Sequence, residues 1–184
     1  MIDFCILGSG VAGSTIAKFL SKKYEILIVD KARGPGGRAS NKRLSKNLSF
    51  DHGVQYITPK TNEFKKFVNY LHKKKILKIW DGYHIDFKFE KRKLDKKFIG
   101  RFGNNAISKY NLKNINQEYE SQIVSIFYNN FFWEIKLSNQ KIIKARSIIL
   151  TCPYPQLIKL AKKYLNRKLL NLKINMVPNI TTMI

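Results

Sequence analysis

The sequence predicts an α/β fold built around a Rossmann-like βαβ unit. Residues 2–7 and 25–30 form two short, almost continuous apolar runs, which are typical of buried parallel strands. Residues 11–22 lie between them and carry apolar side chains at helical spacing. A glycine-rich turn joins the first run to this helix. Strand, turn, helix and strand therefore fit within about 30 residues, as a dinucleotide-binding βαβ unit requires.

The composition is that of a folded domain with a large positive charge. The chain has 184 residues, 44% of them hydrophobic, and 35 Lys and Arg against 12 Asp and Glu give a net charge of +23. Such a charge would suit a nucleic acid or an anionic membrane surface. Most of the cations are lysines spread along the chain, however, and Lys, Asn and Ile all have A/T-rich codons. A codon bias therefore explains the charge without a selected polyanion site, and we expect no specific nucleic-acid partner.

Several other classes of protein are disfavoured. No apolar run reaches the roughly 18 residues that a membrane span needs. The first apolar run has no basic leader and breaks at Gly8, so it does not predict a signal peptide. The two cysteines, Cys5 and Cys152, have no metal-ligand spacing, and we predict no metal site. Two free thiols favour a reducing, cytoplasmic location.

The turn Gly8-Ser9-Gly10-Val11-Ala12-Gly13 has the spacing of a dinucleotide fingerprint. Gly8 permits the tight turn, Gly10 leaves room for a pyrophosphate, and Gly13 lets helix and strand pack closely. The helix N-terminus supplies N–H donors for the phosphates. Asp30 closes the second strand, where its carboxylate can accept hydrogen bonds from the adenosine ribose. The residues that this motif predicts as cofactor-binding are Gly8, Gly10, Val11, Ala12, Gly13 and Asp30.

A second glycine pair follows in residues 31–38, Lys31-Ala32-Arg33-Gly34-Pro35-Gly36-Gly37-Arg38. Gly36 and Gly37 allow the backbone to lie against a bulky ligand. Arg38 can bond phosphate oxygens or loop carbonyls. A plain NAD domain has no need for this loop. The combination resembles the flavoproteins of the monoamine oxidase and renalase superfamily, in which this Gly-Gly-Arg is the second signature, and it implies FAD as the cofactor.

Further segments resemble the same superfamily. Residues 50–58 resemble the segment beside the flavin ring, and residues 98–107 the glycine-containing turn into a short helix. The strand beginning at Ile123 is similar to the one whose backbone meets the adenine, and residues 148–156 to the proline turn that leads back to the substrate domain. Core packing of Tyr56 is an equal alternative to a flavin contact. The resemblance adds as cofactor-binding residues Lys31, Gly37, Arg38, Gly53, Gln55, Tyr56 and Ile123.

The resemblance also implies a domain organisation and a function. Residues 1–60 and 96–155 would form a discontinuous FAD-binding domain, and residues 61–95 and 156–184 an incomplete α+β substrate domain inserted in it. The implied activity is oxidation of a small molecule, an amine or a dihydronicotinamide-type compound, by hydride transfer to the flavin. No catalytic acid or base is predicted, nor an oligomeric state.

The length of the chain leaves two alternatives open. Two-domain flavoenzymes need roughly 300 residues, about 150 per domain. The first alternative is therefore a non-catalytic or truncated dinucleotide-binding fragment. A basic nucleic-acid-binding protein is a less favoured one.

Hydrophobic periodicity predicts the remaining elements. Residues 31–49 are expected to form an ordered loop, residues 76–89 short strands and residues 88–97 a solvated hairpin or loop. Helices are expected at 62–75, at 105–110 and, as one basic amphipathic helix, at 156–172. A meander is expected at 122–128, 132–137 and 142–145, followed by a separate buried strand at 147–151.

Overall fold

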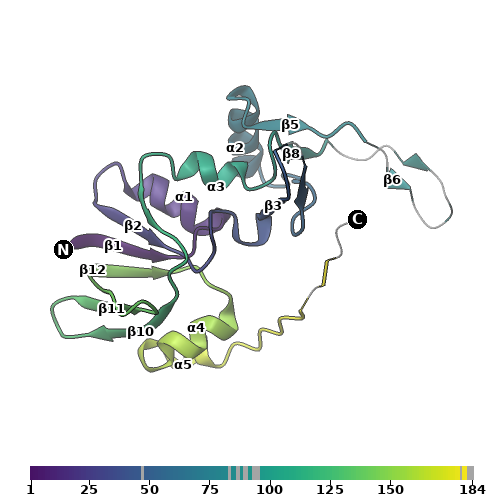
Figure 1. The fold of residues 1–184 in the computed structure, drawn as a ribbon. Helices are drawn as coiled ribbons and strands as arrows, with labels where there is room; N and C mark the ends of the chain where they lie inside the picture. The colour runs from purple at the N-terminus through teal and green to yellow at the C-terminus, as the bar shows by residue number, and fades with distance from the viewer. Residues whose placement is uncertain are drawn as a thin grey trace.

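The structure is a computed structural model, which describes residues 1–46, 48–82, 84, 85, 88, 91, 92, 96–178, 180 and 181. A six-stranded sheet with the order β10-β11-β12-β1-β2-β9 forms its centre (Figure 1). Strands β12, β1, β2 and β9 run parallel, whereas β10 and β11 pair antiparallel. The strands are β1 (Ile2–Leu7), β2 (Ile26–Val29), β9 (Asn116–Glu118), β10 (Ile123–Tyr128), β11 (Trp133–Leu137) and β12 (Ile142–Leu150).

Helices cover both faces of this sheet. Helices α1 (Val11–Leu20) and α3 (Ala106–Asn111) lie on one face, and α4 (Tyr154–Ala161) and α5 (Arg167–Leu170) lie on the other (Figure 1). Ala17 of α1 packs against Ile6 and Ile28, all three fully buried. Ala161 of α4 belongs to the cluster on the opposite face. The predicted α/β class with a parallel sheet and a Rossmann-like βαβ unit is confirmed.

A smaller group of elements lies beyond one end of the sheet. It consists of α2 (Asn62–Lys73), the antiparallel pair β5 (Leu77–Ile79) and β8 (Phe98–Gly100), and the pair β6 (His84–Ile85) and β7 (Lys91–Arg92). Leu71 and Val68 of α2 are fully buried and pack with Phe98 and with Ile107 of α3. The helix predicted at 62–75 is therefore confirmed. The loop predicted at 88–97 falls largely outside the described residues.

The structure differs from the sequence prediction in two stretches, one in the central sheet and one at residues 31–49. The meander strand and the separate buried strand are one strand, β12, because Ala145 pairs with Trp133 of β11 and also with Ile2 of β1. Residues 31–49 were expected as a loop, but they contain the 3₁₀ turn η1 (Gly37–Ala39) and β3 (Asn41–Arg43), which pairs with β4 (Ser49–Asp51).

The single helix expected at 156–172 is also wrong. The chain forms α4, a 3₁₀ turn η2 (Lys162–Tyr164) and α5. Leu165 and Asn166 adopt extended backbone angles, and the Asn166 side chain accepts a hydrogen bond from the Leu169 N–H at 2.9 Å. Asn166 is thus the N-cap of a new helix. Its side chain accepts from the Leu169 N–H, which in one continuous helix would donate to a backbone carbonyl instead. None of the helices in the described part of the chain is long and apolar enough to cross a membrane.

Candidate dinucleotide-binding site

The candidate site lies at the carboxyl ends of the central parallel strands. Gly8 follows β1, Asp30 follows β2 and Thr151 follows β12. Thr151 Oγ1 donates to the Leu7 carbonyl at 2.7 Å and lies 2.7 Å from where a Gly8 Cβ would stand. Gly8 also has a φ of +104°, which a side chain would strain. Thr151 therefore fixes the first turn, a role that the sequence motif does not reveal.

Glycine stands at the other two positions of the motif, 13 and 10, for different physical reasons. A Cβ on Gly13 would stand 2.0 Å from the Gly8 carbonyl oxygen, so glycine lets α1 pack against the turn. A Cβ on Gly10 would meet no protein atom closer than 3.7 Å, the Cα of Gly37. The fold itself therefore does not require glycine at position 10. The room beside Gly10 suits a ligand that approaches the backbone closely.

The N-terminus of α1 offers donors for an anion at the same place. Within the described residues, the N–H groups of Val11, Ala12 and Gly13 donate to no protein acceptor, while Ser14 N donates to the Gly10 carbonyl at 2.9 Å. No acidic residue occupies the first turn of the helix. Unpaired N–H groups and the positive end of the helix dipole together favour a phosphate.

Asp30 has a structural role besides the predicted ribose contact. Its Oδ2 accepts hydrogen bonds from Ser9 N at 2.7 Å and from Ser9 Oγ at 2.6 Å, and its Oδ1 accepts one from Ala32 N at 2.9 Å. The carboxylate therefore holds the glycine turn against the end of β2. Nearby, burial raises the pKa of Tyr119 to about 12, opposed by a hydrogen bond with Ser9 and reinforced by the charge of Asp30.

The second glycine pair lies directly on the first. Gly36 N donates to the Ser9 carbonyl at 3.1 Å, and a Cβ on Gly37 would stand 3.0 Å from the Gly10 Cα. Both glycines have positive φ, +146° and +55°. A Cβ on Gly36 would also stand 2.9 Å from the Asn105 Cβ, and the buried Oδ1 of Asn105 has no hydrogen-bond partner in the part of the chain that the structure describes. Such an acceptor is costly unless a water or a ligand satisfies it.

A third segment, residues 53–56, packs beside this pair. A Cβ on Gly53 would stand 2.0 Å from the Arg38 carbonyl oxygen, which accepts a hydrogen bond from Val54 N at 2.9 Å. The Arg38 side chain is exposed. The loop that carries Arg38 is therefore tied through its backbone to the segment predicted to lie beside the flavin.

Asn104 fixes that segment, although sequence reasoning did not select it. Its Nδ2 donates to the Val54 and Gln55 carbonyls at 2.6 and 3.1 Å, and its Oδ1 accepts from Gly100 N at 2.8 Å. The signal that could have found it is an asparagine directly after Gly103, in a turn between a strand and a helix. Asparagine in such turns commonly bonds the nearby backbone.

The remaining predicted residues lie around this core. Tyr56 is half-buried and stacks on Trp80, with ring centroids 5.7 Å apart and an interplanar angle of 6°. Lys97 Nζ lies 3.7 Å from the Tyr56 ring centroid. Lys31 and Gln55 are exposed.

The start of β10 lies close to the end of β2. Ser121 N donates to the Asp30 carbonyl at 3.0 Å, two residues before Ile123, whose own side chain is buried in the core. The segment before Ile123 is therefore near the acidic end of the site. The assignment of these residues as cofactor contacts stays a prediction.

Comparison with known proteins agrees with this architecture. A family model described as an NAD(P)-binding Rossmann-like domain matches residues 6–71, which hold both glycine loops and the segment at 53–56. The N-terminal part of the chain is a Rossmann-like domain. The matched residues 6–71 make up about a third of the chain, and they contain most of the predicted site residues.

Solved structures extend the similarity to nearly the whole chain. A protein described as a protoporphyrinogen oxidase from Exiguobacterium sp. 255-15 matches with a TM-score of 0.69 and 8% identity over 92% of this chain and 63% of its own. A putrescine oxidase variant from a redesign of cofactor binding matches with a TM-score of 0.70 and 11% identity over 92% and 62%. At such low identities, the similarity establishes the fold alone.

A sequence relative covers less. An uncharacterised protein of Methanocaldococcus jannaschii is 34% identical over 65 residues, which are 35% of this chain and 18% of that protein. The chain thus spans less than two thirds of the length of each protein compared.

Proposed function

We propose that this chain carries the FAD-binding site of an oxidoreductase that oxidises a small molecule. The observation that carries the proposal is the contact between the two glycine loops, Gly36 N with the Ser9 carbonyl and Gly37 with Gly10. A dinucleotide domain that bound NAD alone would have no need of the second loop. The solved structures with this fold include proteins named as oxidases, one of them redesigned in its cofactor binding.

The residues present fit a flavin dinucleotide. The free N–H groups at Val11 to Gly13 would hold the pyrophosphate, and Asp30 with the backbone near Ile123 would hold the adenosine. Residues 53–56 would lie beside the flavin ring. The unpaired Oδ1 of Asn105 next to Gly36 offers one acceptor to a ligand hydroxyl or a water. When bound, the flavin supplies the capacity to accept a hydride, while the chain binds, orients and shields it.

The substrate class in this proposal is an amine or a dihydronicotinamide-type compound. A catalytic acid or base is not part of the proposal, because none of the predicted site residues has that role. A cytoplasmic location belongs to the proposal as well, on the strength of the free thiols Cys5 and Cys152. The second candidate, a non-catalytic dinucleotide-binding fragment, is favoured by the partial coverage of the solved oxidases.

Titration of the purified chain with FAD and, separately, with NAD tests the cofactor. We expect saturable quenching of flavin fluorescence by the protein and no comparable change with NAD. Gly10→Leu should abolish FAD binding, because its side chain would fill the room left beside the two loops. Gly34→Leu is the matched control, since nothing lies within 4 Å of a Cβ at that position.

The outcomes separate the candidates. Binding of NAD with no response to FAD would contradict the flavin proposal, and equal FAD affinity in Gly10→Leu would show that the glycine loops do not hold the ligand. Bound FAD that no amine or dihydronicotinamide reduces would favour the non-catalytic fragment.

A further inference from the structure

A second polar hollow lies outside the candidate dinucleotide site. It lies between the β3–β4 hairpin and the turn at residues 101–103, with a cavity volume of about 280 Å³. We call it the hairpin pocket. Asn41 pairs with Asp51 and Arg43 pairs with Ser49, so these four side chains share one face of the hairpin. That face borders the pocket.

The floor of the hairpin pocket is held rigidly. Gly103 has a φ of +108°, and a Cβ there would stand 2.6 Å from the Asn41 Cγ. Asp51 Oδ1 accepts hydrogen bonds from Asn41 Nδ2 at 3.0 Å and from Asn104 N at 2.8 Å. The turn and the hairpin are therefore locked together before any ligand arrives, which lowers the entropy cost of binding.

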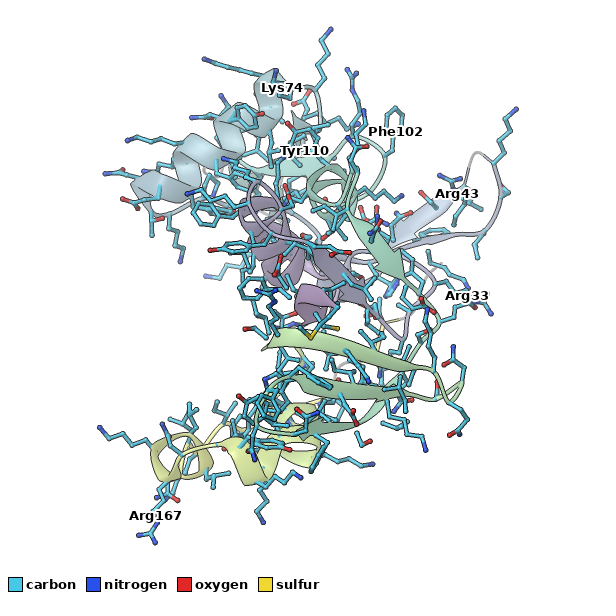
Figure 2. The ribbon with its side chains drawn as sticks, turned by 90° about the vertical axis from the view of Figure 1, so that its left-hand side faces the viewer. Arg33, Arg43, Lys74, Phe102, Tyr110 and Arg167 are labelled. Carbon is cyan, nitrogen blue, oxygen red and sulfur yellow. The ribbon has the colours of Figure 1, made fainter. Side chains whose placement is uncertain are left out.

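Three cations surround this floor. Arg43, Lys46 and Arg101 line the pocket, and within the described residues none of them has an ion-pair partner. Arg43 and Phe102 lie toward the same edge of the molecule, far from Arg167 (Figure 2). Phe102, which is 79% exposed, and Leu48 are the apolar residues of the pocket lining. Arginines in such a cluster are suited to bidentate contacts with a phosphate.

Asp51 restricts which anions fit. Its Oδ1 already accepts two hydrogen bonds, and its Oδ2 accepts none among the described residues. A bare anion would meet this carboxylate with repulsion, whereas a ligand with a hydroxyl group could donate to Oδ2. We propose that the hairpin pocket binds a small phosphorylated compound with hydroxyl groups, the phosphate on the arginines and a hydroxyl on Asp51.

The test uses ribose 5-phosphate as the probe and isothermal titration at physiological salt on the full chain. We expect saturable one-to-one binding. Inorganic phosphate should bind about tenfold more weakly, because it lacks the sugar hydroxyl that would donate to Asp51. Ribose should show no binding, because it lacks the phosphate that the arginines would hold. Arg43→Gln with Arg101→Gln should weaken binding of the probe by about tenfold or more.

Two controls decide the location of the bound probe. Arg167→Gln with Lys168→Gln removes the same charge from α5 and should change the affinity by less than about twofold. Gly10→Leu should also leave the affinity unchanged, since the glycine loops are not the proposed site. Circular dichroism on each variant checks that the fold is kept.

The proposal fails if the Arg43/Arg101 and Arg167/Lys168 double variants weaken binding equally, because that result would mean a general attraction to a chain of charge +23. It also fails if binding is not saturable, or if Gly10→Leu abolishes it while the pocket variant keeps it. None of these results depends on whether the chain binds FAD.

Discussion

Asn104 is 1% exposed, and both ends of its side-chain amide are bonded to the backbone. These bonds join β8 to the Val54–Gln55 segment, while its backbone N–H bonds Asp51 in the hairpin pocket. Asn104, through its side chain and its backbone N–H together, therefore links the proposed flavin side of the molecule to the hairpin pocket. We therefore expect a substitution at Asn104 to disturb both proposed sites.

Asn104→Ala should lower the free energy of unfolding by about 2–4 kcal/mol, because it leaves a buried N–H and two carbonyls unpaired. Chemical denaturation measures this loss. Asn62→Ala, at an exposed position on α2, is the control and should change stability by less than about 0.5 kcal/mol. Equal stability of Asn104→Ala and the wild-type chain would mean that water replaces these bonds at no cost.

Cys5 gives the chain a predictable weakness at alkaline pH. Burial raises the pKa of its thiol from 9.0 to about 12. In the unfolded chain the thiol loses its proton above pH 9, whereas in the folded chain it keeps its proton until the pH approaches 12. The stabilising effect of the buried thiol is therefore complete below pH 9 and is lost progressively between pH 9 and 12. Tyr119, with its pKa raised to about 12, acts in the same direction.

We expect the free energy of unfolding to fall between pH 9 and 11, by as much as about 1.4 kcal/mol per pH unit from Cys5 alone. Cys5→Ala should lower stability at pH 7 and flatten the alkaline slope. Urea titrations at several pH values measure both. An unchanged slope in Cys5→Ala would assign the alkaline loss to other groups.

At the scale of elements, β12 joins the antiparallel part of the central sheet to its parallel part. Its first half pairs antiparallel with β11 and its second half pairs parallel with β1. Ser147, opposite Phe4, lies in the second half. Ser147→Pro should cost about 3 kcal/mol or more, since proline removes a ladder hydrogen bond from a central strand. Ser147→Ala keeps the ladder and should remain folded by thermal melting; a folded proline variant would contradict the pairing.

The elements that the sequence predicted well are those with a strong local signal. The continuous apolar runs of β1 and β2 and the amphipathic spacing of α2 each identify one element without reference to the rest of the chain. The sequence did not reveal β9, because residues 116–118 are polar and lie at the sheet edge, where β2 is their one neighbour among the described strands. It also divided β12 into two strands, because a strand that changes partners at Ala145 also changes its pattern of burial.

The candidate site shows the same limit. The glycine spacing and Asp30 could be selected because their chemistry is encoded locally. Thr151 and Asn104 could not, because their roles come from contacts with residues 144 and 50 positions away. Long-range hydrogen bonds leave no periodic trace in a sequence.

At the scale of the whole molecule, the charge of +23 leads to a prediction about nucleic acids. Scattered lysines should bind DNA weakly and without sequence preference. The affinity should fall by about a thousandfold or more between 50 and 200 mM salt, if roughly six phosphates are contacted. Fluorescence anisotropy with two unrelated duplexes measures this dependence. A tight complex with one duplex at physiological salt would instead mean that the charge serves a specific nucleic-acid function.

The pairing of β1 with β12 has a consequence for synthesis of the chain. Strand β1 ends at Leu7, and its partner begins at Ile142. At bacterial or eukaryotic elongation rates, the ribosome needs on the order of ten seconds to make the intervening polypeptide. During that time β1 and β2 can pair, but one edge of β1 has no neighbour. The nascent chain is therefore exposed to edge-to-edge association until β12, in the last quarter of the 184 residues, emerges. Binding of a holding chaperone to this intermediate would be expected to raise the yield of folded protein.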